Sequence, residues 1–278
     1  MIDKADVEVA ETATVAVGEL IKAAGDTPEA KKAAQNIGRA AVTLTAAINN
    51  CLLPIAAVNF GFEKAKQYFG RKFQEDIAEA TKDVPLESLI EPKPSLAGPA
   101  LQALAFSHDE LDLKDLYIKL LATSMDNRCA SRAHPAFVEM LRQLTAKEAR
   151  ALQDILQASQ IEICRVDLVS TTEGMGRRTL QSHVMNAVDS DTHLPVEDDE
   201  LAAMVDNWVR LGLITVNYDR WALGEQAYDW METRPEILKY RAMITSSDRR
   251  IEPAKGLVLR TALGAQFAEA TGIIKVNR

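Results

Sequence analysis

The side chains best suited to chemistry are four histidines and three cysteines, and most of them lie far apart in the sequence. No histidine has another three or four residues away, the spacing at which two imidazoles on one helix face share a metal ion. The cysteines form no CxxC pair. The sequence therefore predicts no catalytic residue, no cofactor and no metal site among these side chains: His108, His134, His183, His193, Cys51, Cys129 and Cys164.

One neighbourhood keeps an enzymatic alternative open. Cys129 lies five residues before His134 and stands between Arg128 and Arg132. Nearby positive charge lowers the pKa of a thiol, so a nucleophilic Cys–His pair is one hypothesis. The other, which we favour, is a structural cysteine and a histidine that caps the turn at Pro135.

The charge balance restricts the classes of partner. The 278 residues, 47% of them hydrophobic, are enough for one or two domains with a core. There are 32 basic and 40 acidic side chains, a net charge of -8, of which residues 1–200 contribute -10 and residues 201–278 contribute +2. This argues against a general nucleic-acid coat or a polybasic membrane binder, but it leaves nucleic-acid binding open for the C-terminal part.

The cysteine spacing and the first residues predict a cytoplasmic protein. Three isolated cysteines are typical of a reducing compartment. The first 20 residues carry five acidic side chains, whereas a secretory signal needs a basic start followed by an apolar core.

Residues 40–62 form an uncharged run of 23 residues, long enough to cross a bilayer as one helix. Pro54 lies near its centre, and three asparagines and six alanines weaken its tendency to insert. We favour a pair of buried helices broken near Pro54. A membrane-active hairpin and a permanent span are the alternatives.

The first third of the chain is predicted to be helical, over residues 5–24, 28–53 and 54–82. Aromatic and basic side chains recur at helical spacing in the last of these segments. They form either core with a solvated rim or an amphipathic face for a membrane or a partner. The residues of this face are Phe62, Lys66, Phe69, Arg71 and Phe73.

Four prolines in residues 84–99 predict a linker between an N-terminal helical region, 1–83, and a second domain, 100–278. Within the second domain, capping boxes at Ser107–Glu110 and Thr145–Glu148 predict two helix starts. Residues 170–199 are polar and are expected to form an insertion with one short helix near 178–188.

The last 80 residues predict a winged-helix-like module. A helix over 201–211 is followed by strands at 213–217 and 256–261 and a closing helix, with a helical insertion at 222–243. The fold class expected is mainly α: an N-terminal helical region followed by a C-terminal winged-helix-like α+β module. Four cations near the return strand are candidate contacts to nucleic acid or a partner: Arg249, Arg250, Lys255 and Arg260.

Three segments resemble the abortive infection alpha (Abi-alpha) family of bacterial phage-resistance proteins. They are LYIKLLATSMDNRCASRAHPAFVEMLRQLTAKEARAL at 116–152, NWVRLGLITV at 207–216 and KGLVLRTALGAQFAEA at 255–270. The resemblance extends over roughly 40–270 and brings no active-site residue with it. It implies a bacterial protein of antiviral defence, of the abortive-infection type.

Together these observations favour a non-enzymatic sensor or effector that contacts a protein partner or a phage component, with residues 40–82 able to rearrange towards a membrane on activation. The alternative from a second class is a winged-helix DNA-binding regulator. A homo-oligomer is compatible with either.

Overall fold

The computed structural model describes residue 48 and residues 64–172, 176–189 and 191–275. The chain divides into two compact units, unit 1 being residues 1–153 with 266–278 and unit 2 being residues 154–265. The division falls inside two helices, and the predicted linker at 84–99 lies within unit 1. Two of the predicted helices, over 5–24 and 28–53, lie outside the described residues, and so does the uncharged run at 40–62. Ile48 is the one exception.

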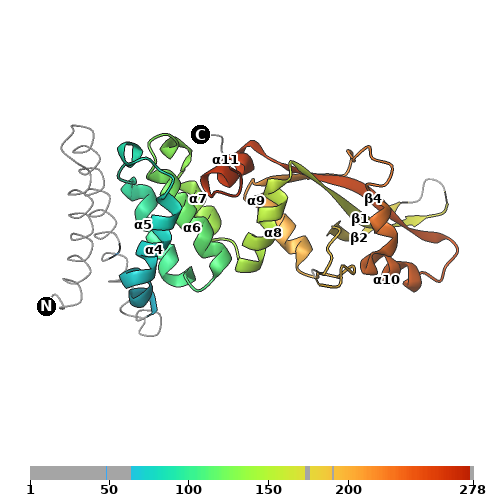
Figure 1. Ribbon diagram of the computed structural model, residues 1–278. Helices are drawn as coiled ribbons and strands as arrows, with labels where there is room; N and C mark the ends of the chain where they lie inside the picture. The colour runs from blue at the N-terminus through green and yellow to red at the C-terminus, as the bar shows by residue number, and fades with distance from the viewer. Residues whose placement is uncertain (1–47, 49–63, 173–175, 190, 276–278) are drawn as a thin grey trace, which may run out of the picture. The chain divides into compact units, whose positions relative to one another are not determined.

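Unit 1 is helical in its described part, with α6 in contact with α4, α5 and α7 (Figure 1). Three leucines of α6, Leu116, Leu120 and Leu121, recur at helical spacing and are fully buried. The elements are the π-helix η1 (Tyr68–Lys72), α4 (Phe73–Thr81), η2 (Leu86–Ser88), α5 (Pro94–Ser107), α6 (Leu111–Ser124), η3 (Ala130–Arg132), α7 (Ala136–Leu141), and the unit 1 parts of α8 (Ala146–Gln157) and α11 (Ala262–Ala270).

The proline-rich segment is tied to the body of unit 1. The amide of Ile90 donates to the carbonyl of Met125 at 2.8 Å, and the amide of Asn127 donates to the carbonyl of Ser88 at 2.9 Å. Pro94 then starts α5, where its missing N–H would have had no helical partner.

Of the two predicted capping boxes, one is confirmed. The Thr145 amide donates to the Glu148 carboxylate at 2.8 Å, and the Glu148 amide donates to the Thr145 hydroxyl at 3.2 Å. The box at Ser107–Glu110 is wrong, because α5 continues through Ser107. Its hydroxyl donates to the carbonyl of Ala103 at 3.0 Å, one turn back in that helix.

Unit 2 contains, within its described residues, a four-stranded antiparallel sheet with strand order β2-β1-β4-β3. The long strands β1 (Gln160–Ser170) and β4 (Arg249–Arg260) pair along their whole length (Figure 1). The other strands are β2 (Arg177–Val184) and β3 (Ile214–Asn217). The helices are α9 (Leu201–Arg210), η4 (Asp229–Thr233) and α10 (Pro235–Met243), and α9 contacts β2 and β3.

The predicted fold class, mainly α with a winged-helix-like module, is therefore wrong. The helix at 201–211, the strand after it and the closing helix exist, but they accompany a curled sheet whose first two strands were not predicted. The stretch near 178–188, predicted as a helix, is mostly β2. Six of its eight side chains are polar, so it becomes a strand through pairing with β1 and not through its own pattern.

In the described residues, no helix combines the length and apolar character that crossing a membrane requires.

One face of the sheet is covered by the excursion between β3 and β4. Cys164, Val166 and Val184 of the sheet pack against Tyr228, Met231 and Ile237, all of them buried. We call this side the core face. It explains why the insertion at 222–243 is rich in aromatic residues: the tyrosine and its neighbours fill the layer between the sheet and α10.

A buried ion pair fixes the start of α10. The Arg234 guanidinium is fully buried and bonds the Glu236 carboxylate from Nε at 3.0 Å and from Nη2 at 2.6 Å. Its Nη1 and Nη2 also donate to the carbonyls of Ala187 and Val196 in the loop before α9. One side chain thus ties two long connections together, and both charges are compensated.

We expect Arg234→Met to lower the free energy of unfolding by about 3–5 kcal/mol, because Glu236 would remain buried without a counter-charge. Urea unfolding of the full chain measures this. Arg241→Met is the matched control: Arg241 pairs with the exposed Glu232 at 2.7 Å, so its loss should cost within about 1 kcal/mol. Equal losses for the two variants would contradict the role of Arg234.

Candidate functional site

The face of the sheet opposite the core face carries a row of charges. Successive residues of a strand point to opposite sides, and the register sets Asp167 of β1 beside Thr179 of β2 and Glu252 of β4. Three arginines lie on the same face in the neighbouring rows: Arg165 opposite Ala254, and Arg177 and Arg250 opposite Val169. We call the set the charged face: Arg165, Asp167, Arg177, Thr179, Arg250 and Glu252.

Asp167 is the centre of the charged face. Its carboxylate is fully buried and accepts hydrogen bonds from the Arg165 guanidinium at 3.0–3.1 Å and from the Thr179 hydroxyl at 2.9 Å. Arg177 approaches it at 3.5 Å. A buried carboxylate is tolerated only when it is paired and hydrogen-bonded, and these three side chains from two strands meet that condition.

The row becomes more exposed away from Asp167. Arg177 also reaches Glu252 at 3.5 Å, and Arg250 bonds the same carboxylate at 2.9 Å. The exposed fraction of the arginine side chains rises from 26% at Arg165 to 49% at Arg177 and 62% at Arg250. The result is an alternating series of charges that is anchored at its buried end and open to solvent at the other.

Tyr218, just after β3, packs at the buried end. The Arg165 guanidinium lies 4.9 Å from its ring centroid, a cation–π distance. The ring lies over Gly256, where an added Cβ would come within 2.6 Å of Tyr218 Cδ1 and 2.8 Å of the Asn217 carbonyl oxygen. Glycine is therefore required at this point of β4. Burial raises the pKa of Tyr218 to about 12, so its hydroxyl stays protonated at neutral pH.

His183 closes β2 in a left-handed conformation with φ 60°, which is unusual for a residue other than glycine. Its amide donates to the Tyr218 hydroxyl at 3.1 Å, and its Nδ1 lies 3.0 Å from that oxygen. Its Nε2 lies 3.2 Å from Asp206 of α9. These contacts hold the histidine in its strained backbone position and connect α9 to the sheet.

Cys164 lies on the core face and is not poised as a nucleophile. Burial raises the pKa of its thiol to about 12, with a further increase from Glu236 and a decrease from Arg234. The neutral thiol is thus the form present at physiological pH.

The four predicted cations of the C-terminal part are not gathered at one place. By alternation along β4, Arg249 and Lys255 fall on the core-face side, and Arg250 and Arg260 fall on the other side. Ten residues separate Arg250 from Arg260, which is about 33 Å along a strand. Only Arg250 belongs to the charged face.

Lys255 and Arg260 have structural partners outside the charged face. The Lys255 ammonium lies 5.0 Å from the ring centroid of Tyr228. Arg260 donates through Nη1 to the carbonyl of Leu156, in the last turn of α8, where helix carbonyls lack intrahelical partners.

The helix before the predicted wing, α9, offers few polar side chains for base contacts. In α9, the Arg210 guanidinium bonds the side-chain oxygen of Asn207 at 2.6 and 3.2 Å. With the winged-helix fold overturned, the DNA-binding regulator loses its structural basis.

The predicted aromatic face of the N-terminal region is turned inwards in its described part. Phe69 and Phe73 are each 2% exposed and their ring centroids lie 5.4 Å apart. Lys66 is half-buried and Arg71 lies in η1, while Phe62 lies outside the described residues. A membrane or partner face made of these phenylalanines would need them to leave the core of unit 1.

Cys129 and His134 have separate structural partners. The Cys129 thiol is buried and lies 3.8 Å from the Thr123 carbonyl oxygen. His134 Nδ1 accepts a hydrogen bond from the amide of Ala136 at 3.1 Å, so the imidazole caps the turn that starts α7. In the described part of the chain, no group of three histidine, cysteine or acidic side chains could hold a metal ion.

The charged face was not predicted from the sequence, because β1 was not recognised as a strand. A signal existed in the alternation of IEICRVDLV over 161–169. The register shifts between Cys164 and Asp167 place the extra residues in β2, so the period of two continues through β1, but no local pattern shows that Asp167 is buried.

The comparisons with known proteins place this architecture in one family. The sequence profile described as abortive infection alpha matches residues 65–271, about three quarters of the chain. The chain belongs to the abortive infection alpha family. The resemblance read from residues 116–152, 207–216 and 255–270 is thereby confirmed, and membership in this family points to abortive-infection defence against phage. Comparison with curated proteins and with solved structures finds no match.

We expect the free energy of unfolding of this family member to fall as the pH rises above 9. The Cys164 pKa is about 12 in the folded chain against 9.0 for an unperturbed thiol. The unfolded chain therefore loses the thiol proton first as the pH rises. The contribution of Cys164 to the free energy of unfolding is fully present below pH 9 and falls between pH 9 and 12, by about 1.4 kcal/mol per pH unit for one such group.

Urea unfolding below and above pH 9, for the wild type and for Cys164→Ala, isolates this contribution. The variant loses stability at every pH because it leaves a cavity, but its curve should be flatter above pH 9. Parallel curves would show that Cys164 is not the group responsible.

Proposed function

We propose that this protein acts in abortive infection as a non-enzymatic sensor or effector, and that the charged face of unit 2 is the surface by which it contacts a protein partner. The observation that carries the proposal is the open end of the face. Arg177, Glu252 and Arg250 present half-exposed charges from β2 and β4, the two strands that pair with β1 on either side of the buried Asp167.

Such a surface suits specific protein contact better than catalysis. Exposed ion pairs contribute little to stability, so there is little cost in exchanging them for pairs with a partner. Each guanidinium has five N–H donors, and Arg250 uses only Nε and Nη2 on Glu252. The remaining donors fit a partner that presents carboxylates, and electrostatic complementarity of this kind gives specificity.

The groups most suited to catalysis support a non-enzymatic role. The Cys164 thiol is held protonated, His134 caps a turn, and His183 is bonded to Tyr218 and Asp206. Each of these side chains already has a structural task in the described chain.

The proposal includes a second step, in which residues 40–82 rearrange towards a membrane on activation. It is motivated by the 23 uncharged residues at 40–62 beside the aromatic segment. Exposing Phe69 and Phe73 would cost on the order of 4–6 kcal/mol of burial free energy, so the resting state should not bind membranes and a trigger is needed.

The test is a double variant, Arg177→Gln with Arg250→Gln, expressed in cells challenged with phage. We expect protection to be lost while the protein accumulates normally, because the fold keeps the Arg165–Asp167 pair. Affinity purification from infected cells, with membrane and soluble fractions separated, should recover a partner with the wild type and not with the variant.

The matched control removes two positive charges elsewhere: Arg150→Gln with Arg241→Gln. Both arginines lie in ion pairs, with Asp112 at 2.9 Å and with Glu232 at 2.7 Å. The control should protect as the wild type does. Full protection by the charged-face variant, or equal loss in both, would refute the contact surface.

A further inference from the structure

Unit 1 contains a cavity of about 540 Å³ among α4, α6, the loop after α6 and the end of α11. Its volume is within the range of small-molecule sites. Six charged side chains line it: Asp83, Lys119, Arg128, Arg132, Glu269 and Lys275. We propose that this cavity binds a phosphorylated small molecule of nucleotide size, a role separate from the contact surface of unit 2.

The wall offers cationic donors to an anion. Four of the lining side chains are basic and two are acidic. Lys119 is paired with Asp115 at 2.7 Å and Arg128 with Asp126 at 2.6 Å, so the donors left for an anion are those of Arg132, of Lys275 and of Nη1 of Arg128. A phosphate monoester carries about -1.5 to -2 at neutral pH and presents three acceptor oxygens. Guanidinium groups match those oxygens with paired donors.

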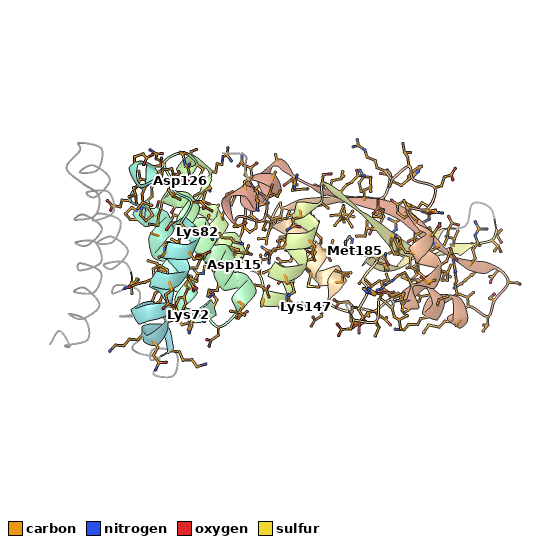
Figure 2. All side chains as sticks on the ribbon, viewed as in Figure 1. Lys72, Lys82, Asp115, Asp126, Lys147 and Met185 are labelled. Carbon is orange, nitrogen blue, oxygen red and sulfur yellow. The ribbon has the colours of Figure 1, made fainter. Side chains whose placement is uncertain are left out.

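The loop after α6 is held firmly enough to position its arginines. Asp126, labelled in Figure 2, is fully buried and binds Arg128 through Nε at 2.8 Å and Nη2 at 2.6 Å. This leaves the Arg128 Nη1 group outside the pair. Gly272, with φ 68°, allows the stem of Lys119 to pass, since an added Cβ would lie 2.8 Å from its Cδ.

Arg132 provides the most specific indication of a ligand. Its Nη1 atom is shielded from solvent and makes no hydrogen bond in the described structure. Glu269 lies 3.3 Å away, close enough for ionic attraction, but not aligned with the N–H groups. Buried donors are nearly always satisfied, so an acceptor from a ligand accounts for this one.

The rest of the wall suits the uncharged part of such a molecule. The wall also includes uncharged side chains, among them Ala80, Ala122 and Ile274. Half of the lining residues are charged, so the pocket suits a ligand with a charged group and a smaller uncharged part. A phosphate attached to a nucleoside fits this division.

Isothermal titration calorimetry on the full chain tests the proposal with three probes: ADP, pyrophosphate and adenosine. We expect binding of ADP and pyrophosphate and none of adenosine. Arg132→Gln should weaken ADP binding about tenfold or more, the effect of losing a charged hydrogen bond. Glu269→Gln should strengthen it, because the carboxylate competes for Arg132.

Lys275→Gln is a second variant at an exposed position, which should weaken ADP binding without affecting folding. Arg150→Gln, with an exposed guanidinium away from the cavity wall, should leave it unchanged. Absence of ADP and pyrophosphate binding at millimolar concentration, equal binding of adenosine, or an equal effect of Arg150→Gln would overturn the proposal. Binding to phosphatidic acid vesicles in place of ADP would overturn the assignment of a soluble ligand.

Discussion

The burial of the Asp167 carboxylate is the constraint on which unit 2 depends. A charge that is removed from water must be met by donors at fixed positions, and Arg165 and Thr179 supply them from β1 and β2. This requirement sets the register of two strands and determines the face on which Arg177, Glu252 and Arg250 emerge. The proposed contact surface is therefore a consequence of satisfying one buried charge.

The opposite face of the sheet also contains a buried, paired charge. Arg234 is buried with Glu236 and holds two connections, through the carbonyls of Ala187 and Val196, against the layer that contains Cys164. Buried ion pairs often add little net stability compared with apolar packing, but losing one partner is costly. Such pairs make the arrangement of the long insertions specific, which would keep the charged face in one shape for recognition.

The predictions that succeeded were those that depend on residues close together in the sequence. The apolar period of α9, the Thr145–Glu148 capping box and the turn at His134 each depend on residues a few positions apart. Apart from the capping box at Ser107–Glu110, the errors concern pairing between distant segments. β2 has little apolar alternation, contains the extra residues of the register shifts opposite Asp167, and is a strand because it pairs with β1. The burial of Asp167 and Arg234 depends on the whole unit, so no sequence window could predict the charged face.

The contact surface can be tested at two neighbouring residues of β1 that point to opposite faces. Val169 pairs with Arg177 and Arg250 on the charged face, whereas Leu168 pairs with Arg178 and Ile251 on the other side. Both side chains are half-exposed. A photo-cross-linking amino acid placed at Val169 should give a discrete protein adduct in phage-infected cells, and the same group at Leu168 should not. Absence of an adduct at Val169, or the same adduct from both positions, would contradict the account.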